Sequence, residues 1–236
     1  MEKVIYAVWK SNEIDRATFN AQLLNTVGPD LCSKALAVRL NLQDNDVAGG
    51  SSPRAVATQP QMDAVIQLWL DSANLSFRRS VDDYIAQKVS KFEAWLVSES
   101  TAIKNKKYPP NLGQRTEGFS QIVFLHRLDG MLWNEWREHW HNTHTQVAIE
   151  TQSNFEYQQN LVTRRLTDGS NNYAAIVEEC FPKAAFTDAL VYFDAPGDGH
   201  KMQKNLGAMM QSVGNFIDHA KMDCMPTSQY DLKTIS

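Results

Sequence analysis

A run of nine residues, Trp136 to His144, contains two tryptophans and three histidines. The unperturbed pKa of histidine lies near neutral pH, so a histidine in such a run could act as a general acid or base. On a helix Trp136, Trp140 and His144 are four residues apart and lie on one stripe, which Ala148 continues. The run is therefore either the packing face of an aromatic helix or the chemical centre of the protein.

The elements that would position this run follow an order that occurs twice in the chain. Each half reads β-α-β-β-α-β, which is the ferredoxin-like pattern. The first half predicts strands at 4–9, 37–42, 65–70 and 98–103 with helices at 15–27 and 81–96, the first of which Gly28-Pro29 should end. The second half predicts strands at 122–126, 157–162, 174–181 and 219–224 with helices at 132–148 and 202–217.

This repeat predicts an α+β protein built from two ferredoxin-like halves. Residues 1–104 form a degenerate half, residues 105–117 a polar, Pro-containing linker, and residues 118–236 the half that carries the site. A single sheet of this type leaves one apolar face bare, and two such sheets can bury these faces against each other. We therefore expect the halves to pack sheet to sheet as a pseudo-dimeric α/β barrel, with any pocket between the sheets.

The repeat also separates packing residues from a candidate catalytic residue. A shift of 117 positions places Phe19 on Trp136 and Leu23 on Trp140, so both tryptophans occupy positions that are apolar in the other half. The same shift places Val27 on His144. Burying a histidine where an aliphatic side chain suffices costs free energy unless the ring is hydrogen-bonded. This difference indicates His144 as the functional residue of the run.

A metal site is not expected in the run. Two ligands on one helix face need a spacing of three or four, which only His141 and His144 meet, and no suitable glutamate lies between them. His139 and His141 should instead lie at the surface or around the residues that contact the substrate. His141 remains a candidate substrate contact.

Composition excludes several other classes of function. The net charge of -4 and the dispersed basic residues argue against nucleic-acid binding, and no apolar run is long enough to span a membrane. Three scattered cysteines and an N-terminus without a secretory pattern favour a reducing cytoplasm. No nucleotide-binding or esterase motif is present, and no cofactor is predicted.

The second half resembles the EthD-like family of the dimeric α/β-barrel superfamily. The resemblance lies in a strand that ends at His126, an aromatic-x-x-x-Trp-x-x-x-His helix from Trp136 to His144, and a Tyr-x-x-Asn strand from Tyr157 to Asn160. It implies a ferredoxin-like barrel and small-molecule metabolism, with relatives that include dehydratase, cyclase and decarboxylase types. The first half departs from the pattern at Leu23 and Val27, so one site per chain is expected.

The leading hypothesis is a cofactor-independent lyase or isomerase, of dehydratase or decarboxylase type, acting on a hydrophobic, carbonyl-bearing small molecule. His144 would be the general acid/base, with Tyr157 as a catalytic hydrogen-bond donor. Asn160 would orient the substrate, Trp140 would form an apolar wall, and His126 would be a second acid/base or a polar anchor.

Two alternatives remain open on the sequence alone. One is a non-catalytic accessory protein that carries a hydrophobic intermediate of a degradation pathway. The other is a haem- or oxygen-related monooxygenase, since the resemblance also extends to haem-degrading and cofactorless members of the superfamily. A homodimer is compatible with each of these.

Overall fold

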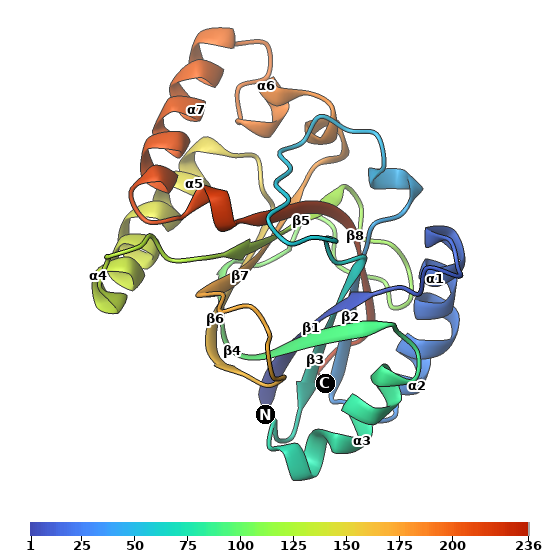
Figure 1. Ribbon diagram of the computed structural model, residues 1–236. Helices are drawn as coiled ribbons and strands as arrows, with labels where there is room; N and C mark the ends of the chain where they lie inside the picture. The colour runs from blue at the N-terminus through green and yellow to red at the C-terminus, as the bar shows by residue number, and fades with distance from the viewer. Residues whose placement is uncertain (236) are drawn as a thin grey trace.

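Within residues 1–235, which the computed structural model describes, eight antiparallel strands close into one barrel (Figure 1). Going round the barrel, the order is β1-β3-β2-β8-β5-β7-β6-β4. The strands are β1 Glu2–Trp9, β2 Ala37–Leu42, β3 Ala64–Leu70, β4 Lys91–Ile103, β5 Phe119–Leu125, β6 Glu156–Arg165, β7 Ala175–Phe181 and β8 Asp223–Lys233. Closure leaves no sheet edge exposed, which removes a common route to aggregation.

Each half of the chain supplies one four-stranded sheet. The first half contributes β4-β1-β3-β2 and the second β8-β5-β7-β6, the same order in both. Two antiparallel seams, β2 with β8 and β4 with β6, join the sheets. The predicted fold class, two ferredoxin-like halves in an α/β barrel, is confirmed.

The helices lie outside the barrel, those of each half over their own sheet (Figure 1). The first half has α1 Arg16–Gln22, a π-helical segment Leu23–Val27, α2 Gly28–Cys32 and α3 Leu75–Ala86. The second has α4 Trp133–Glu138, a π-helical segment His139–His144, α5 Thr145–Thr151, α6 Ala189–Tyr192 and α7 Gly199–Gly214. Short 3-10 turns occur at Asn45–Val47, Lys183–Phe186 and His219–Lys221. No helix among the described residues has both the length and the apolar character needed to cross a membrane.

The duplication extends to a local irregularity of the first helix in each half. The two π-helical segments end at Val27 and at His144, the positions that the repeat relates. A π-turn inserts an extra residue into a helix and is often found at functional sites. Asp15 caps α1 as expected, because its side chain accepts a hydrogen bond from the Thr18 amide.

The predicted helix end at Gly28-Pro29 is wrong. Gly28 has an ordinary right-handed helical conformation, and the helix continues to Cys32. Proline is tolerated in a first turn, where its missing N–H is not needed. A Cβ at position 28 would lie 2.1 Å from Leu232 Cδ1, so a larger residue there would have to displace this side chain of β8.

Two other predicted segments also differ from the structure. The helix predicted at 81–96 ends at Ala86, and β4 begins at Lys91. Its residues alternate between Ala94, which packs under the helices, and Trp95, which fills the barrel. The last strand runs from Asp223 to Lys233 and not from 219 to 224.

The barrel interior is filled by side chains, with an apolar part and a charged part. The apolar part includes Trp95, Phe124 and Tyr173, whose ring centroids lie 5.0 to 5.8 Å apart. The charged part centres on Arg39 of β2. At one end of the barrel a pocket of about 240 Å³ opens between the two sheets, and Arg39, Glu156 and Asp231 line it.

Arg39 binds three carboxylates that all belong to the second half. Its guanidinium contacts Asp231 through Nε at 2.7 Å and Nη2 at 3.0 Å, and Nη1 lies 2.7 Å from Glu156 and 3.0 Å from Glu178. Burial alone would lower the pKa of Arg39, but the three carboxylates raise it well above its usual value. The side chain therefore stays charged and ties β2 to β6, β7 and β8.

Replacing Arg39 by methionine is expected to destabilise the fold by about 3–5 kcal/mol, because it leaves buried carboxylates without their cation. Chemical denaturation at neutral pH measures the change in unfolding free energy. Arg79→Met removes the same charge from an exposed position of α3 and is the matched control. A loss no larger than the control's would show that the ion network does not stabilise the barrel.

Candidate active site

A cavity of about 200 Å³ lies between the sheet of the second half and the helices that cover it. Its floor comes from strands β5 to β8 and its roof from the π-helical segment His139–His144 and α7. Pro53, from the segment between β2 and β3, also lines the cavity. The polar lining residues are Gln121, His144, Gln152, Tyr157, Glu179, Tyr192, His219 and Cys224, and most of the others are aliphatic, aromatic or methionine side chains.

His144 lies in this cavity, at the end of the π-helical segment, and is 9% exposed. Its Nδ1 is 3.0 Å from Ser212 Oγ of α7, and its ring packs on Phe216 at 4.7 Å. Burial, with a smaller effect of His139, lowers the pKa of His144 to about 4. The imidazole is therefore neutral at physiological pH, with one nitrogen held by Ser212.

Tyr157 and Trp140 line the same cavity and contact each other. Trp140 Nε1 donates to the Tyr157 hydroxyl at 3.3 Å, and Gln159 Nε2 donates to it at 3.2 Å. Burial raises the pKa of Tyr157, so the phenol stays protonated. Because both contacts place an N–H on the phenol oxygen, the O–H itself remains a donor.

Glu179 is a lining residue that the sequence analysis missed. It lies on β7 opposite Tyr157 of β6 and is 9% exposed. Asn154 Nδ2 donates to its Oε1 at 2.7 Å. Burial raises the pKa of Glu179 to about 7, and this one hydrogen bond only partly opposes the effect. A carboxyl group with such a pKa exchanges protons readily at neutral pH.

The sequence did contain a signal for Glu179. Two adjacent glutamates interrupt the apolar run of β7, and side chains alternate along a strand. One of the pair must then face the barrel and the other the helices. Burying either carboxylate costs free energy unless a hydrogen bond or a cation compensates it.

A chain of hydrogen bonds crosses the cavity floor beside Glu179. Gln152 Nε2 donates to the Tyr192 hydroxyl, which donates to Gln121 Oε1, and Gln121 Nε2 donates to Cys224 Sγ. Burial raises the pKa of Cys224 to about 12, so the thiol is protonated and unsuited to act as a nucleophile.

Residues 128–220 match the family model of the EthD domain. The second half of the chain contains an EthD domain. His144, Tyr157 and Glu179 lie within the matched residues. No curated protein matches the chain by sequence.

Solved structures match the whole chain in fold. An anthrone oxidase-like protein superposes with a TM-score of 0.55 at 6% identity, over 100% of this chain and 94% of that one. A proposed monooxygenase of Fusobacterium nucleatum subsp. nucleatum gives a TM-score of 0.50 at 11% identity, over 98% and 92%. A proposed chlorite dismutase gives 0.50 at 8%, over 100% and 98%. At these identities the likeness shows the fold, a tandem barrel.

Three residues predicted for the site do not line the cavity of the EthD domain. Asn160 is three residues from Tyr157, so it points to the other side of β6, where its Nδ2 donates to the Ile176 carbonyl oxygen. His126 follows β5, is partly buried and packs on Tyr173 at 4.8 Å. His141 is exposed, with its ring against Trp140.

The equivalent space in the first half is filled. Val27, the counterpart of His144, and Leu23, the counterpart of Trp140, are fully buried in the core of that half. Among the described residues, no three His, Cys, Asp or Glu side chains converge as a metal site requires. The cavity of the EthD domain is also smaller than the roughly 300–1,000 Å³ of pockets for drug-sized ligands, so its residues do not fit a haem.

Glu179 should make the stability of the protein depend on pH. Its pKa is raised in the fold, so its favourable contribution is complete below its unfolded value of 4.5 and is lost as pH rises through about 7. Glu179→Gln should therefore be more stable than wild type at pH 8 by on the order of 3 kcal/mol and gain little at pH 4.5. Thermal melts at both pH values measure this difference. Glu150→Gln, at an exposed site of α5, is the control, and parallel pH dependence of wild type and Glu179→Gln would contradict the raised pKa.

Proposed function

We propose that this protein is a cofactor-independent oxygenase that removes a proton from a hydrophobic, carbonyl-bearing small molecule and lets the resulting enolate react with dioxygen. The observation that carries the proposal is Glu179, a buried carboxylate that titrates near neutral pH in an apolar cavity. Its location beside Tyr157 and in the same cavity as His144 supplies both a base and hydrogen-bonding groups for an enolate oxygen.

Glu179 is the proposed general base. The best base for a reaction at neutral pH has a pKa near that pH, since it is then both ionised and strong enough to take the proton. The neutral His144, with a pKa of about 4, is a weaker base. We assign to it and to the Tyr157 hydroxyl the binding of the substrate oxygen, where negative charge develops as the C–H bond breaks.

The oxidation can balance without a cofactor. The base takes one proton from a CH₂ group next to the conjugated carbonyl system, and the electron pair of that bond enters the enolate. The enolate gives one electron to dioxygen, the two radicals combine to form a C–O bond, and protonation gives a hydroperoxide. Loss of water then leaves a new carbonyl group, so that CH₂ and O₂ become C=O and H₂O.

The comparisons favour this reaction over the lyase or isomerase predicted from the sequence. The matching structures include an anthrone oxidase-like protein and a proposed monooxygenase, and none that is described above is named as a lyase. Lyase and isomerase reactions would begin with the same proton transfer, so Glu179 and His144 would keep their roles and only the fate of the enolate would differ.

Anthrone, a tricyclic ketone with an acidic CH₂ group, is the substrate probe. The purified protein should consume dioxygen and form anthraquinone in equal amounts, above the rate without protein and in the presence of a chelator. Glu179→Gln should slow turnover by roughly 10²–10⁴, the usual contribution of a general base. His144→Ala should also reduce turnover, while Glu150→Gln should leave it unchanged. Anthrone that binds without dioxygen uptake would favour the carrier alternative, and full activity in Glu179→Gln would remove the base from the mechanism.

The pH dependence of kcat/KM should identify the base. Since only the ionised carboxylate accepts a proton, kcat/KM should rise with pH and reach half its maximum near pH 7, because burial raises the pKa of Glu179 to about 7. A transition near pH 4 that persists in Glu179→Gln would instead assign the base to His144.

A further inference from the structure

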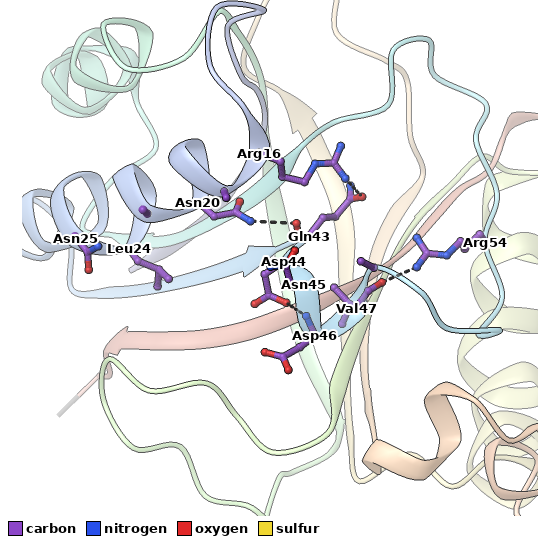
Figure 2. A pocket seen from close by; sticks show the side chains of 13 residues that line it. Arg16, Asn20, Leu24, Asn25, Gln43, Asp44, Asn45, Asp46, Val47 and Arg54 are labelled. Atoms are coloured by element: carbon purple, nitrogen blue, oxygen red, sulfur yellow. Dashed lines mark hydrogen bonds between the residues drawn. The ribbon is translucent and has the colours of Figure 1, made fainter.

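A second cavity, of about 450 Å³, lies in the first half of the chain, where no reaction is proposed (Figure 2). It is formed by the outer side of α1 and the segment that follows β2, from Gln43 to Ala48, together with Arg54. It shares no lining residue with the cavity of the EthD domain, although Arg54 directly follows Pro53, which lines that cavity. Its volume is within the usual range for small-molecule pockets.

Two arginines from different segments line this cavity, Arg16 beside Gln43 and Arg54 beside Val47 (Figure 2). Arg16 is already engaged, with Nη1 2.9 Å from Gln43 Oε1 and Nη2 3.1 Å from Asp63 Oδ1. Arg54 donates from Nη2 to the Val47 carbonyl oxygen at 2.7 Å. Within residues 1–235 no carboxylate lies at ion-pair distance from Arg54. Arg54 is exposed, so water solvates its charge, and part of its donor fork has no protein partner.

The acidic residues of the cavity do not neutralise Arg54. Asp44 accepts hydrogen bonds from Ser228 Oγ and from the Tyr230 hydroxyl, both on β8. Asp46 pairs with Arg115 at 3.6 Å. Figure 2 shows both carboxylates directed away from the arginines. Burial is the main cause that lowers the pKa of Arg54, and the positive charge of Arg16 has a smaller effect in the same direction.

The opposite end of the cavity is apolar. Ala17 and Ala21 of α1 and Leu24 of the π-helical segment lie along this side, and Figure 2 shows Leu24 distant from the two arginines. The cavity therefore combines a guanidinium that has no carboxylate partner with an apolar wall.

We propose that this cavity binds a small organic monocarboxylate, whose carboxylate pairs with Arg54 and whose apolar body lies against Ala17, Ala21 and Leu24. A carboxylate fits the planar fork of a guanidinium and forms charge-assisted hydrogen bonds with it. One negative charge suffices, because Arg16 is already neutralised by Asp63. This site is independent of the reaction proposed for the EthD domain, so a negative result for one proposal would not contradict the other.

Benzoate is the test ligand, and binding is followed by NMR titration of the amide signals. Benzoate should shift the signals of residues 16–25 and 43–54, and Arg54→Gln should weaken its binding by about tenfold or more, the effect of losing one charge-assisted hydrogen-bond partner. Arg79→Gln removes an exposed charge of α3 and should not change the affinity. Ala21→Trp, which keeps Arg54 but fills the apolar end, should also abolish binding.

Three outcomes would overturn the proposal. The first is that benzoate binds to Arg54→Gln as strongly as to the wild-type protein, or does not bind to the wild-type protein. The second is equal binding of benzamide, which has the same body without the charge. The third is equal or tighter binding of inorganic phosphate at the same amides, which would indicate a general anion site without selection for an organic body.

Discussion

The ion network of Arg39 is the interaction on which the arrangement of the two halves depends. Arg39 comes from the first half and its three carboxylate partners from the second, so the network can form only when the seam between β2 and β8 is correctly paired. Buried ion pairs contribute little net stability compared with apolar packing, but a wrongly placed buried charge is very costly. The network therefore fixes the register of the seam, because a slip of one residue would turn Arg39 out of the barrel.

The cavity that contains His144 and Glu179 is not inside the barrel. Trp95, Phe124 and Tyr173 pack inside the barrel and the Arg39 network lies beside a pocket at its end, whereas this cavity is on the other face of the sheet, under the helices. In the first half this space is closed by Phe19, Leu23 and Val27. In the second half the equivalent positions hold Trp136, Trp140 and His144, and a cavity remains between this helix, α7 and the strands. Of the two halves, the second therefore contains this cavity, and the first has a closed core at the equivalent place.

The fold could be predicted from the sequence because it rests on patterns that repeat: strand alternation, helix periodicity and their order in both halves. His144, Trp140 and Tyr157 were also predictable, since a histidine replaces Val27 across the repeat and the aromatic residues lie at helix and strand spacing. Asn160 was predicted for the site from its spacing to Tyr157, but a separation of three on a strand puts the two on opposite faces. The end of β8 and the start of β4 could not be predicted, because their pairing across the seams depends on residues distant in the sequence.

Glu178 and Glu179 are adjacent residues whose carboxyl groups lie in different environments. The two residues are adjacent on β7 and of the same type, but one faces the barrel and the other the cavity. Burial tends to raise both pKa values; for Glu178 the charge of Arg39 and hydrogen bonds from Asn41 and Gln229 reverse this and lower its pKa. Within residues 1–235 no cation pairs with Glu179, so burial prevails and its pKa rises to about 7. A pair of carboxylates whose environments push their pKa values apart is a recognised arrangement for dividing roles. Here strand alternation places Glu178 against Arg39 inside the barrel and Glu179 in the cavity, so adjacent residues of β7 supply a structural ion pair and the proposed general base.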